Sequence, residues 1–335
     1  MAIPSLTPLD TVAPTGKHLV GIAKRAAQSP SLDSKRRVEY FHLASSSLLN
    51  RCHNARLPFE WTINPYRGCE FGCRYCYARY THEFLGLENP REFEEKIYSK
   101  AAVAEILQKE LRQDPGGAIA IGTATDPYQP AERLYHTTRS ILQTLAEFRG
   151  LRLSITTKSA LVTRDIALLR ELAGSNAVQV NMTITTLDDE LAGKLEPRAP
   201  RPALRLGAVR RLAEAGIRVV IFAMPVLPGI TDAPENLEAV ARAGAAAGAQ
   251  SFQTNLLFLM PSAQKAFFPF LDEQFPRWAS LYRQWYSRGA YLRGKTEDRM
   301  QTLARRLRWK YFPRHAEAES PLPAFGRRDQ LSFFP

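Results

Sequence analysis

The sequence predicts an α/β protein built around a parallel (β/α) barrel. Apolar runs rich in β-branched residues are short enough to be buried parallel strands, and helical patterns lie between successive runs. The strand starts recur about every 26 to 40 residues, a spacing that suits βα units. The predicted strands are 118–125, 151–157, 177–185, 217–226 and 251–259, and the predicted helices are 99–112, 130–148, 163–173, 203–215 and 233–247.

Composition indicates a protein of the cytoplasm with no membrane-spanning segment. The chain has 335 residues, of which 45% are hydrophobic, so it is long enough to bury a large core. No apolar run approaches the roughly eighteen residues that a membrane span needs. Nothing at the N-terminus resembles a signal peptide, so we expect the four cysteines to stay reduced rather than form disulfides.

The net charge of +12 is concentrated at the two ends of the chain. Residues 61–276 carry 24 basic and 24 acidic side chains, whereas residues 1–60 carry 8 and 4, and residues 277–335 carry 13 and 5. A neutral middle with basic flanks favours a polyanionic partner, because Lys and Arg gain affinity for phosphates by releasing counterions. Nucleic acid, DNA in particular, is the expected partner, although many basic proteins bind no polyanion.

Four segments are predicted along the chain. Residues 1–55 form a basic N-terminal arm, in which 1–38 shows little periodicity. Residues 56–265 form the barrel. A helical basic extension covers 266–315, and a flexible tail covers 316–335.

The most informative stretch is the run NPYRGCEFGCRYCYARY at 64–80, which holds three of the four cysteines. Cys69, Cys73 and Cys76 are spaced C-x3-C-x2-C, unlike the paired C-x2-C knuckles of zinc sites. Three thiolates on so short a loop suit an iron–sulfur cluster, and a cluster of four irons would keep one iron open for a substrate or cosubstrate. The alternatives are a structural zinc site completed by Cys52 or His53, or, for Cys52 alone, an ordinary half-buried thiol.

Polar residues stand where the predicted strands end, which is the edge at which barrels of this kind place their sites. Each has a structural alternative: Asp126 precedes a proline and could only shape a turn, Lys158 could be a solvated helix-start residue, and Glu196 could simply pair with Arg198. The residues are Thr123, Thr125 and Asp126 after the second strand, Lys158 after the third, and Thr183, Thr185, Glu196 and Arg198 after the fourth.

With Tyr75 before the last cysteine, the motif reads C-x3-C-x-aromatic-C and resembles the signature of the radical SAM superfamily. The resemblance implies a six-stranded partial barrel and a [4Fe-4S] cluster on Cys69, Cys73 and Cys76. It also implies S-adenosylmethionine (SAM) bound to the fourth iron and cleaved to methionine and a 5′-deoxyadenosyl radical. An electron donor such as flavodoxin or ferredoxin would reduce the cluster.

A narrower resemblance, from about 40 to 259, is to the spore photoproduct lyase branch of that superfamily. The segments GTATDPYQPAE, ITTK, EPRAP and VVIFAMPVLPG carry it. The chain resembles the uncharacterised lyase-like relatives within that branch more closely still, because they share the INPYRGC entry and the CYARYTHEFLG exit around the cysteines. The resemblance to this branch implies that Lys158 contacts the methionine part of SAM and that Thr183 contributes a hydroxyl. The resemblance as a whole makes the following residues candidate SAM contacts: Tyr75, Thr125, Asp126, Lys158, Thr183, Glu196 and Arg198.

Two features depart from that branch. The lyase has a cysteine that returns a hydrogen atom to its product, whereas this chain has Thr123 or a neighbour there and no cysteine beyond Cys76. A threonine O–H bond is too strong for that role, so Tyr128 is the candidate for relaying the hydrogen. The Gly-Gly-Glu run that most radical SAM enzymes use for the SAM ammonium is also absent, which makes Thr125 and Asp126 provisional.

The C-terminal region carries two aromatic patterns. Trp278, Tyr282, Trp285 and Tyr286 share one helix face, which predicts core packing over the open side of the barrel rather than a base-stacking surface. Basic residues interleaved with aromatic ones form the better nucleic-acid surface, with a solvated helix as the alternative. They are Arg305, Arg306, Arg308, Trp309, Lys310 and Tyr311.

The tail ends in a run similar to the motif by which bacterial polymerases and repair proteins bind the sliding clamp. The run comprises Gln330, Leu331, Ser332, Phe333 and Phe334, and it differs from the motif at Phe333. Short motifs of this kind anchor apolar side chains in a preformed groove, and the alternative is a tail that folds back onto its own barrel.

The sequence therefore favours a lyase-like radical SAM enzyme that repairs or modifies DNA. Modification of RNA or of a protein is the alternative within enzymes. The non-enzymatic alternative is a zinc-bearing protein that binds nucleic acid.

Overall fold

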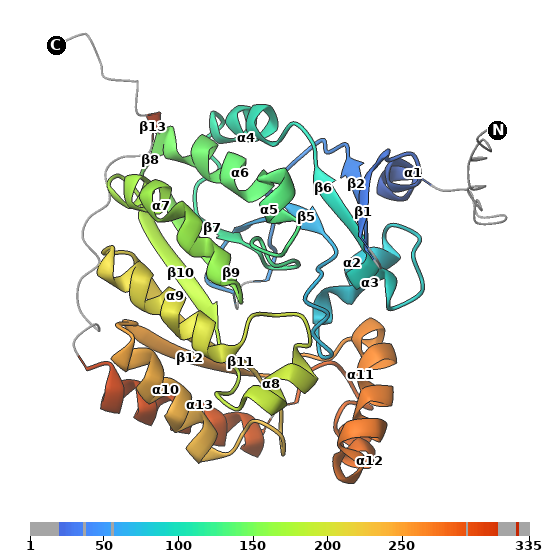
Figure 1. Cartoon of the computed structure of the whole chain (residues 1–335), viewed down its shortest axis with the longest axis vertical. Helices are drawn as coiled ribbons and strands as arrows, with labels where there is room; N and C mark the ends of the chain where they lie inside the picture. The colour runs from blue at the N-terminus through green and yellow to red at the C-terminus, as the bar shows by residue number, and fades with distance from the viewer. Residues whose placement is uncertain (1–19, 36–37, 55–56, 293, 314–325, 328–335) are drawn as a thin grey trace, which may run out of the picture.

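The structure is a computed structural model that describes residues 20–35, 38–54, 57–292, 294–313 and 326–327 (Figure 1). The predicted clamp-binding run at 330–334 lies outside these residues. The division of the chain at 55, 265 and 315 stays a prediction. No helix in the described part is long and apolar enough to span a membrane.

The main sheet confirms the partial barrel. Within the described residues it has seven strands, and six of them are joined by parallel pairing: β4, β7, β9, β10, β11 and β12. β3 adds an antiparallel edge strand beside β4, and the sheet does not close. The order is β12 (Ser251–Leu256), β11 (Arg218–Val226), β10 (Ala177–Thr183), β9 (Arg152–Thr157), β7 (Ala118–Ile121), β4 (Trp61–Ile63) and β3 (Asn50–Arg51).

Helices connect these strands and cover the outer face of the sheet (Figure 1). Four of the five begin and end within four residues of the prediction, whereas α6 begins seven residues after the predicted start, because the separate short helix α5 (Glu132–Tyr135) precedes it. Pro202 and Pro234 stand in the first turns of α9 and α10, where a missing N–H has no cost. The helices are α4 (Val103–Leu111), α6 (Thr137–Ala146), α7 (Ile166–Ala173), α9 (Pro202–Glu214) and α10 (Pro234–Ala246).

Alternate residues of the strands face two different environments. Ile155 of β9, fully buried, belongs to the apolar core between the sheet and its helices. Its neighbour Thr156 faces the opposite, inner side, where Asn181 Nδ2 donates to Thr156 Oγ1 at 3.1 Å and to Ser154 Oγ at 2.8 Å. Gln179 Nε2 donates to Asn181 Oδ1 at 2.6 Å. The interior of the barrel is therefore lined by amides and hydroxyls at this level.

A second, smaller sheet lies beside the barrel. Its order is β1 (Ser31–Lys35), β2 (Val38–Leu43), β6 (Lys96–Lys100) and β5 (Tyr66–Arg67), with β2 and β6 parallel. Tyr40 of β2 is fully buried. The range 1–38, predicted as an arm with little periodicity, therefore contains regular structure, because α1 (Gly21–Ala27) and β1 both lie within it.

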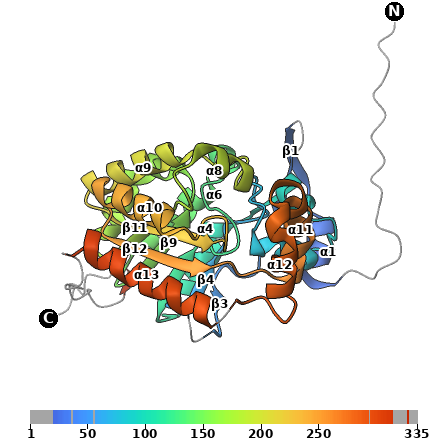
Figure 2. The same cartoon turned by 90° about the horizontal axis from the view of Figure 1, so that it is seen from below.

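The predicted aromatic stripe near residue 280 is core. Tyr282 and Tyr286 are buried, and their hydroxyls donate to Pro228 O and Leu257 O, both at 2.8 Å. The stripe lies on α12 (Pro276–Trp285), which packs against α11 (Pro261–Gln274) beside the end of the barrel (Figure 2). Partly buried Trp278 and Trp285 belong to the same apolar cluster.

The last long helix, α13 (Lys295–Tyr311), lies along the edge strand β12 (Figure 2). Phe312, just after it, stacks on Phe252 of β12 with ring centroids 6.4 Å apart. The shorter elements are η1 (Tyr77–Arg79), α2 (Tyr80–Glu83), α3 (Glu92–Glu95), α5 (Glu132–Tyr135), β8 (Phe148–Arg149), η2 (Ala160–Asp165), α8 (Asp189–Leu195) and β13 (Gly326–Arg327).

The two faces of β9 predict different costs for neighbouring substitutions. Ile155→Ala should lower the free energy of unfolding by about 3 kcal/mol, because it leaves a cavity in the packed outer core. Thr156→Ala should cost about 1 kcal/mol, the net value of one hydrogen bond. Urea denaturation of both variants measures the difference, and equal losses would contradict the assignment of inner and outer faces.

Candidate active site

The three cysteines of the motif lie on one tightly folded loop that follows β5. Gly68 precedes the first of them with φ of 81°, and a Cβ at that position would lie 2.7 Å from Lys96 O. Only glycine allows this approach, which brings Cys69 N–H within 2.9 Å of Phe93 O. Cys69 and Cys73 are buried in the apolar cluster that includes residues of α11 and α12, so these helices shield the loop from water.

Two buried side chains after β7 fix the loop to the barrel. The Thr125 hydroxyl donates to Gly68 O at 2.6 Å, and Gln129 Nε2 donates to the same carbonyl at 3.0 Å. Gln129 Oε1 accepts from Glu70 N–H at 2.9 Å. Thr125, predicted as a SAM contact, thus positions the cysteine loop, and the sequence analysis did not identify Gln129.

Arg79 and Arg198 hold the loop from its other side. Arg79 Nη2 donates to Cys73 O at 3.2 Å and pairs with Glu94 at the same distance. Arg198 Nη1 lies 3.5 Å from Glu70 O and 3.4 Å from the Glu94 carbonyl oxygen. The alternative in which Arg198 simply pairs with Glu196 does not describe these contacts, because the guanidinium of Arg198 is directed at backbone carbonyls and Glu196 pairs with Arg205.

The three thiols share one electrostatic environment. Burial raises the pKa of Cys69 and Cys76, and it raises that of Cys73 to about 12. The thiolates of Cys73 and Cys76 also raise the pKa of Cys69, and that of Cys76 raises the pKa of Cys73, whereas Lys158 lowers the pKa of Cys73 and Cys76. The described residues include no group of three His, Cys, Asp or Glu side chains close enough to share one metal ion. In an iron–sulfur cluster the cysteines bind different irons.

Cys52 stands at the other end of β4 from this loop. Its N–H donates to Glu60 O at 2.8 Å, directly before β4 begins at Trp61, whereas the cysteine loop follows the end of that strand. Three residues of strand separate the two positions by about 10 Å. This position argues against Cys52 as a fourth ligand and suits the half-buried thiol that the sequence analysis kept as its alternative.

A buried ion pair stands beside the cysteine loop. Arg205 of α9 is 1% exposed, and its Nη2 lies 2.5 Å from Glu196 Oε2. The other carboxylate oxygen of Glu196 accepts the Tyr75 hydroxyl. Burial opposes the negative charge of Glu196, but Arg205 and then Lys158 lower its pKa overall. Glu196 and Tyr75, both predicted as SAM contacts, thus bond to each other, and Glu196 is held in place by Arg205, a residue that was not predicted from the sequence.

Arg205 also reaches the strand that carries Thr183. Its Nη1 donates to Thr183 O at 3.0 Å and its Nε to Pro200 O at 2.7 Å. The Thr183 side chain is buried at the end of β10, and the hydroxyl of nearby Thr185 is buried without a hydrogen-bond partner among the described residues. A free buried hydroxyl at a strand end suits a site that receives a polar ligand.

Lys158 is close enough to the cysteine loop to lower the pKa of Cys73 and Cys76. Its ammonium stands 5.7 Å from the centre of the Tyr75 ring, a cation–π distance. Burial opposes its charge, but the Cys73 thiolate and Glu196 raise its pKa overall. Lys158 therefore stays protonated next to the cysteine loop, where a ligand carboxylate can pair with it.

Both carboxylate oxygens of Asp126 accept hydrogen bonds within the turn that follows β7 and from the end of β9. Its Oδ1 accepts from Tyr128 N–H at 2.9 Å and from the Thr157 hydroxyl at 2.7 Å, and its Oδ2 accepts from Lys158 N–H at 2.7 Å. These bonds join the end of β7 to the end of β9. The turn-forming alternative describes what this carboxylate does, and it fixes the backbone of Lys158.

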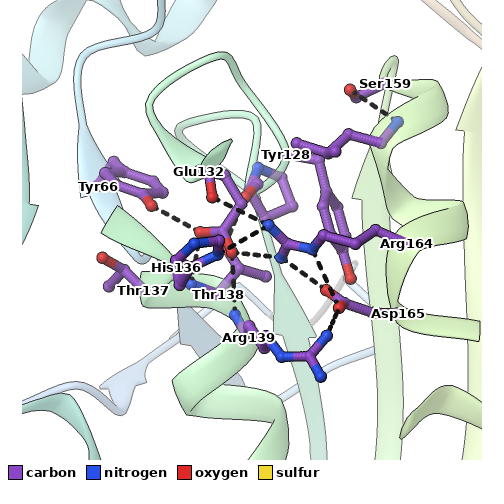
Figure 3. Close-up of polar contacts among 12 residues, drawn as sticks. Tyr66, Tyr128, Glu132, His136, Thr137, Thr138, Arg139, Ser159, Arg164 and Asp165 are labelled. Atoms are coloured by element: carbon purple, nitrogen blue, oxygen red, sulfur yellow. Dashed lines mark hydrogen bonds and ion pairs between the residues drawn. The ribbon is translucent and has the colours of Figure 1, made fainter. Parts of the chain in front are cut away.

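Tyr128 does not face the barrel interior. Its ring is 1% exposed and belongs to the outer core, next to the ion-pair network of Glu132, Arg164 and Asp165 (Figure 3). A hydrogen-atom relay needs contact with the substrate. The buried position of Tyr128 in the outer core therefore argues against its predicted role as that relay. The chain turns outward after Asp126, and no local pattern in the sequence indicates the direction of that turn.

Tyr77 is the tyrosine at the mouth of the barrel, and the sequence analysis missed it. It follows Cys76 directly, is 37% exposed, and donates its hydroxyl to Thr123 O at the end of β7. Its ring lies 5.8 Å from that of Phe258, which in turn lies 4.5 Å from that of Tyr291. These three aromatic rings form a row beside the cysteine loop.

Comparison with known proteins agrees with this geometry. The family model described as "Radical SAM superfamily" matches residues 63–241. An uncharacterised protein of Mycobacterium tuberculosis strain H37Rv is 36% identical over 288 residues, which cover 85% of this chain and 83% of the relative. An uncharacterised protein of Methanocaldococcus jannaschii is 30% identical over 173 residues, covering 52% of this chain and 62% of the relative.

Among solved structures, spore photoproduct lyase complexed with dinucleoside spore photoproduct has a TM-score of 0.63 and 17% identity, covering 82% of this chain and 80% of the lyase. A variant of that lyase with bound AdoMet and the dinucleoside has a TM-score of 0.61 and 16% identity, covering 79% and 77%. At this identity the likeness shows a shared fold.

The chain belongs to the radical SAM superfamily. It is a radical SAM enzyme, and its cofactors are a [4Fe-4S] cluster and SAM.

The buried pair predicts a strong, non-additive effect on stability. Arg205→Met should lower the free energy of unfolding by about 3 to 5 kcal/mol, because it leaves the Glu196 carboxylate buried without its cation. The double variant Glu196→Gln/Arg205→Met should lose clearly less than the sum of the single variants. Chemical denaturation measures all three.

Lys194→Met is the matched control, because Lys194 forms an exposed pair with Glu190 on α8 and its loss should cost no more than about 0.5 kcal/mol. Additive losses at Glu196 and Arg205 would show that the two side chains are not coupled.

Proposed function

We propose that this radical SAM enzyme repairs or modifies a nucleic acid, DNA in particular, and that Cys69, Cys73 and Cys76 hold its cluster. The observation that carries the assignment is the set of three mutually interacting thiols next to Lys158 at the mouth of the barrel. When bound, the cluster supplies the electron that cleaves SAM to methionine and a 5′-deoxyadenosyl radical.

The residues around the thiols have distinct parts in this proposal. Lys158 offers its ammonium to the carboxylate of SAM, and the Thr185 hydroxyl remains available to a polar group of the ligand. Glu196 and Arg205 act as a positioning pair that fixes Tyr75. Thr125 and Gln129 keep the loop in place, and α11 and α12 exclude water from its buried side.

Three features support a nucleic-acid substrate. The row of Tyr77, Phe258 and Tyr291 offers ring faces on which bases can stack. The amides and hydroxyls of the inner barrel face suit the donors and acceptors of a base edge. The similar lyase structures contain dinucleoside spore photoproduct, and this ligand of those proteins belongs to the same chemical class as the substrate proposed here.

The exposed face of α13 supplies a surface for the phosphate backbone. Arg299, Arg305 and Arg306 are exposed on it, and Trp309, 84% exposed, follows them about one turn after Arg305 and Arg306. Lys310 and Tyr311, also predicted to belong to this surface, both bond to Glu238 of α10. The clamp-binding hypothesis rests on the sequence of 330–334 alone.

Cleavage of SAM tests the assignment of the cluster and of Lys158. Protein reconstituted and reduced anaerobically should form 5′-deoxyadenosine from SAM, as measured by chromatography. Cys73→Ala should abolish the product and lower bound iron, whereas Lys158→Met should lower the rate at least about tenfold with iron unchanged, because one charge-assisted contact is lost. The control Lys109→Met changes an exposed lysine of α4 and should behave as wild type. A Lys158→Met enzyme of full activity would remove Lys158 from the site.

Binding of a single-stranded oligonucleotide across a salt series tests the partner. The affinity of wild type should fall steeply with salt, and Arg305→Gln/Arg306→Gln should flatten the slope of log K against log salt by about 1 to 2. Arg210→Gln/Arg211→Gln, an exposed pair on α9, is the matched control and should leave the slope unchanged. Competition between DNA and RNA separates the two nucleic acids. A flat response to salt in wild type would contradict the proposal.

A further inference from the structure

A cavity of about 370 Å³ lies outside the barrel, where β6 ends and the first turns of α4 and α6 meet. It shares no lining residue with the cysteine site. Its principal lining residues are Ser99, Lys100, Ala102, Val103, Thr137 and Ser140. Volumes between about 300 and 1,000 Å³ are typical of sites for small organic ligands.

Lys100 is a buried cation without a partner in the described part of the chain. It is 8% exposed, lines the cavity, and its side chain makes no hydrogen bond or ion pair with another described residue. Its pKa is lowered to about 8, mainly by burial and then by the nearby charge of Arg67, whereas Glu110 acts to raise it. The Glu110 carboxylate already accepts the N–H groups of Leu48 and Leu49. A buried ammonium in this state is costly unless an anion compensates it.

The N-terminus of α4 opens into the same cavity. Ala102 stands before the helix with φ of 50°, and no side chain caps the first turn. The N–H groups of Ala102, Val103 and Ala104 have no hydrogen-bond partner among the described residues. Free N–H groups and the helix dipole together favour an anion at such an end.

The neighbouring helix α6 shows how such an end is satisfied elsewhere in this chain. The Glu132 carboxylate accepts the N–H groups of Thr138 and Arg139, so α6 carries its own anion. On α4 the carboxylate of Glu105 also lines the cavity, but the side chain is exposed and no side chain caps the first turn of the helix.

Hydroxyl groups complete the lining. Ser99 Oγ and Thr137 Oγ1 lie 2.7 Å apart in a buried hydrogen bond, and Ser140 follows on the next turn of α6. Exposed His42 and half-buried Tyr135 stand at the wall. A lysine, free backbone N–H groups and hydroxyls are the donors that phosphate sites use.

We propose that this cavity binds the phosphate group of a phosphate ester, held by the Lys100 ammonium and the N-terminal N–H groups of α4. The ester comes either from the backbone of a nucleic-acid strand or from a free nucleotide, and the phosphate chemistry is the same in both. The site does not depend on the proposed reaction, since it lies outside the barrel and contains none of the cysteine-site residues.

Full-length protein with its cluster reconstituted is titrated anaerobically with three probes: inorganic phosphate, adenosine monophosphate and a ten-residue oligothymidylate. Calorimetry gives the affinity and thermal unfolding gives the midpoint. Lys100→Met should weaken phosphate binding at least about tenfold, and in phosphate-free buffer its midpoint should equal or exceed that of wild type, because the uncompensated charge is gone. Lys109→Met, on the same helix but outside the cavity, should bind as wild type.

The probes distinguish the sources of the phosphate. Binding of oligothymidylate in competition with phosphate assigns the site to a nucleic-acid strand, and binding of adenosine monophosphate alone assigns it to a nucleotide. Ser140→Leu, which fills the cavity but keeps the ammonium, should also lose phosphate binding. This second variant keeps the proposal testable if Lys100→Met fails to fold. Equal binding of phosphate by wild type, Lys100→Met and Ser140→Leu, or no binding by wild type, would overturn the proposal.

Discussion

Three thiols on one loop, with Cys69 and Cys73 buried and Cys76 half-buried, are the constraint on which the rest of this structure depends. As thiolates they repel one another, and burial makes their charges more costly, so positive charge has to stand nearby. The barrel supplies it from separate elements: Lys158 follows β9, Arg205 lies on α9, and Arg79 follows the loop itself. These cations are in turn held by Glu196, Glu94 and the backbone of the loop, which keeps the net charge of the buried site low.

The fold separates stability from chemistry by the two faces of its strands. Apolar residues on the outer face form the core with the helices, whereas amides and hydroxyls on the inner face bond to one another and line the interior. The elements beyond the barrel close the site from outside. Tyr282 of α12 anchors to Pro228 O after β11 and packs in the cluster that contains Cys69 and Cys73.

The sequence predicted the barrel well because strands and helices are local patterns. The cysteine motif also indicated the loop as the candidate site, and the ITTK segment indicated that Lys158 follows a strand end. What the sequence could not reveal were side chains that act across long separations: Gln129 bonds to the loop 61 residues earlier, and Tyr75 meets Glu196 121 residues later. Tyr128 was misassigned because a residue after a strand end can turn inward or outward, and only packing decides which. The parallel pairing of β2 with β6 was missed for the same reason of distance.

The central claim is that Cys69, Cys73 and Cys76 hold a cluster whose open iron receives SAM. Electron paramagnetic resonance of the reduced, reconstituted protein tests it most directly, recorded without and with SAM. The account predicts the signal of a reduced [4Fe-4S] cluster whose g values shift when SAM is added, and its loss in Cys73→Ala. A protein that binds zinc and gives no signal, or a cluster signal that SAM does not change, would contradict it.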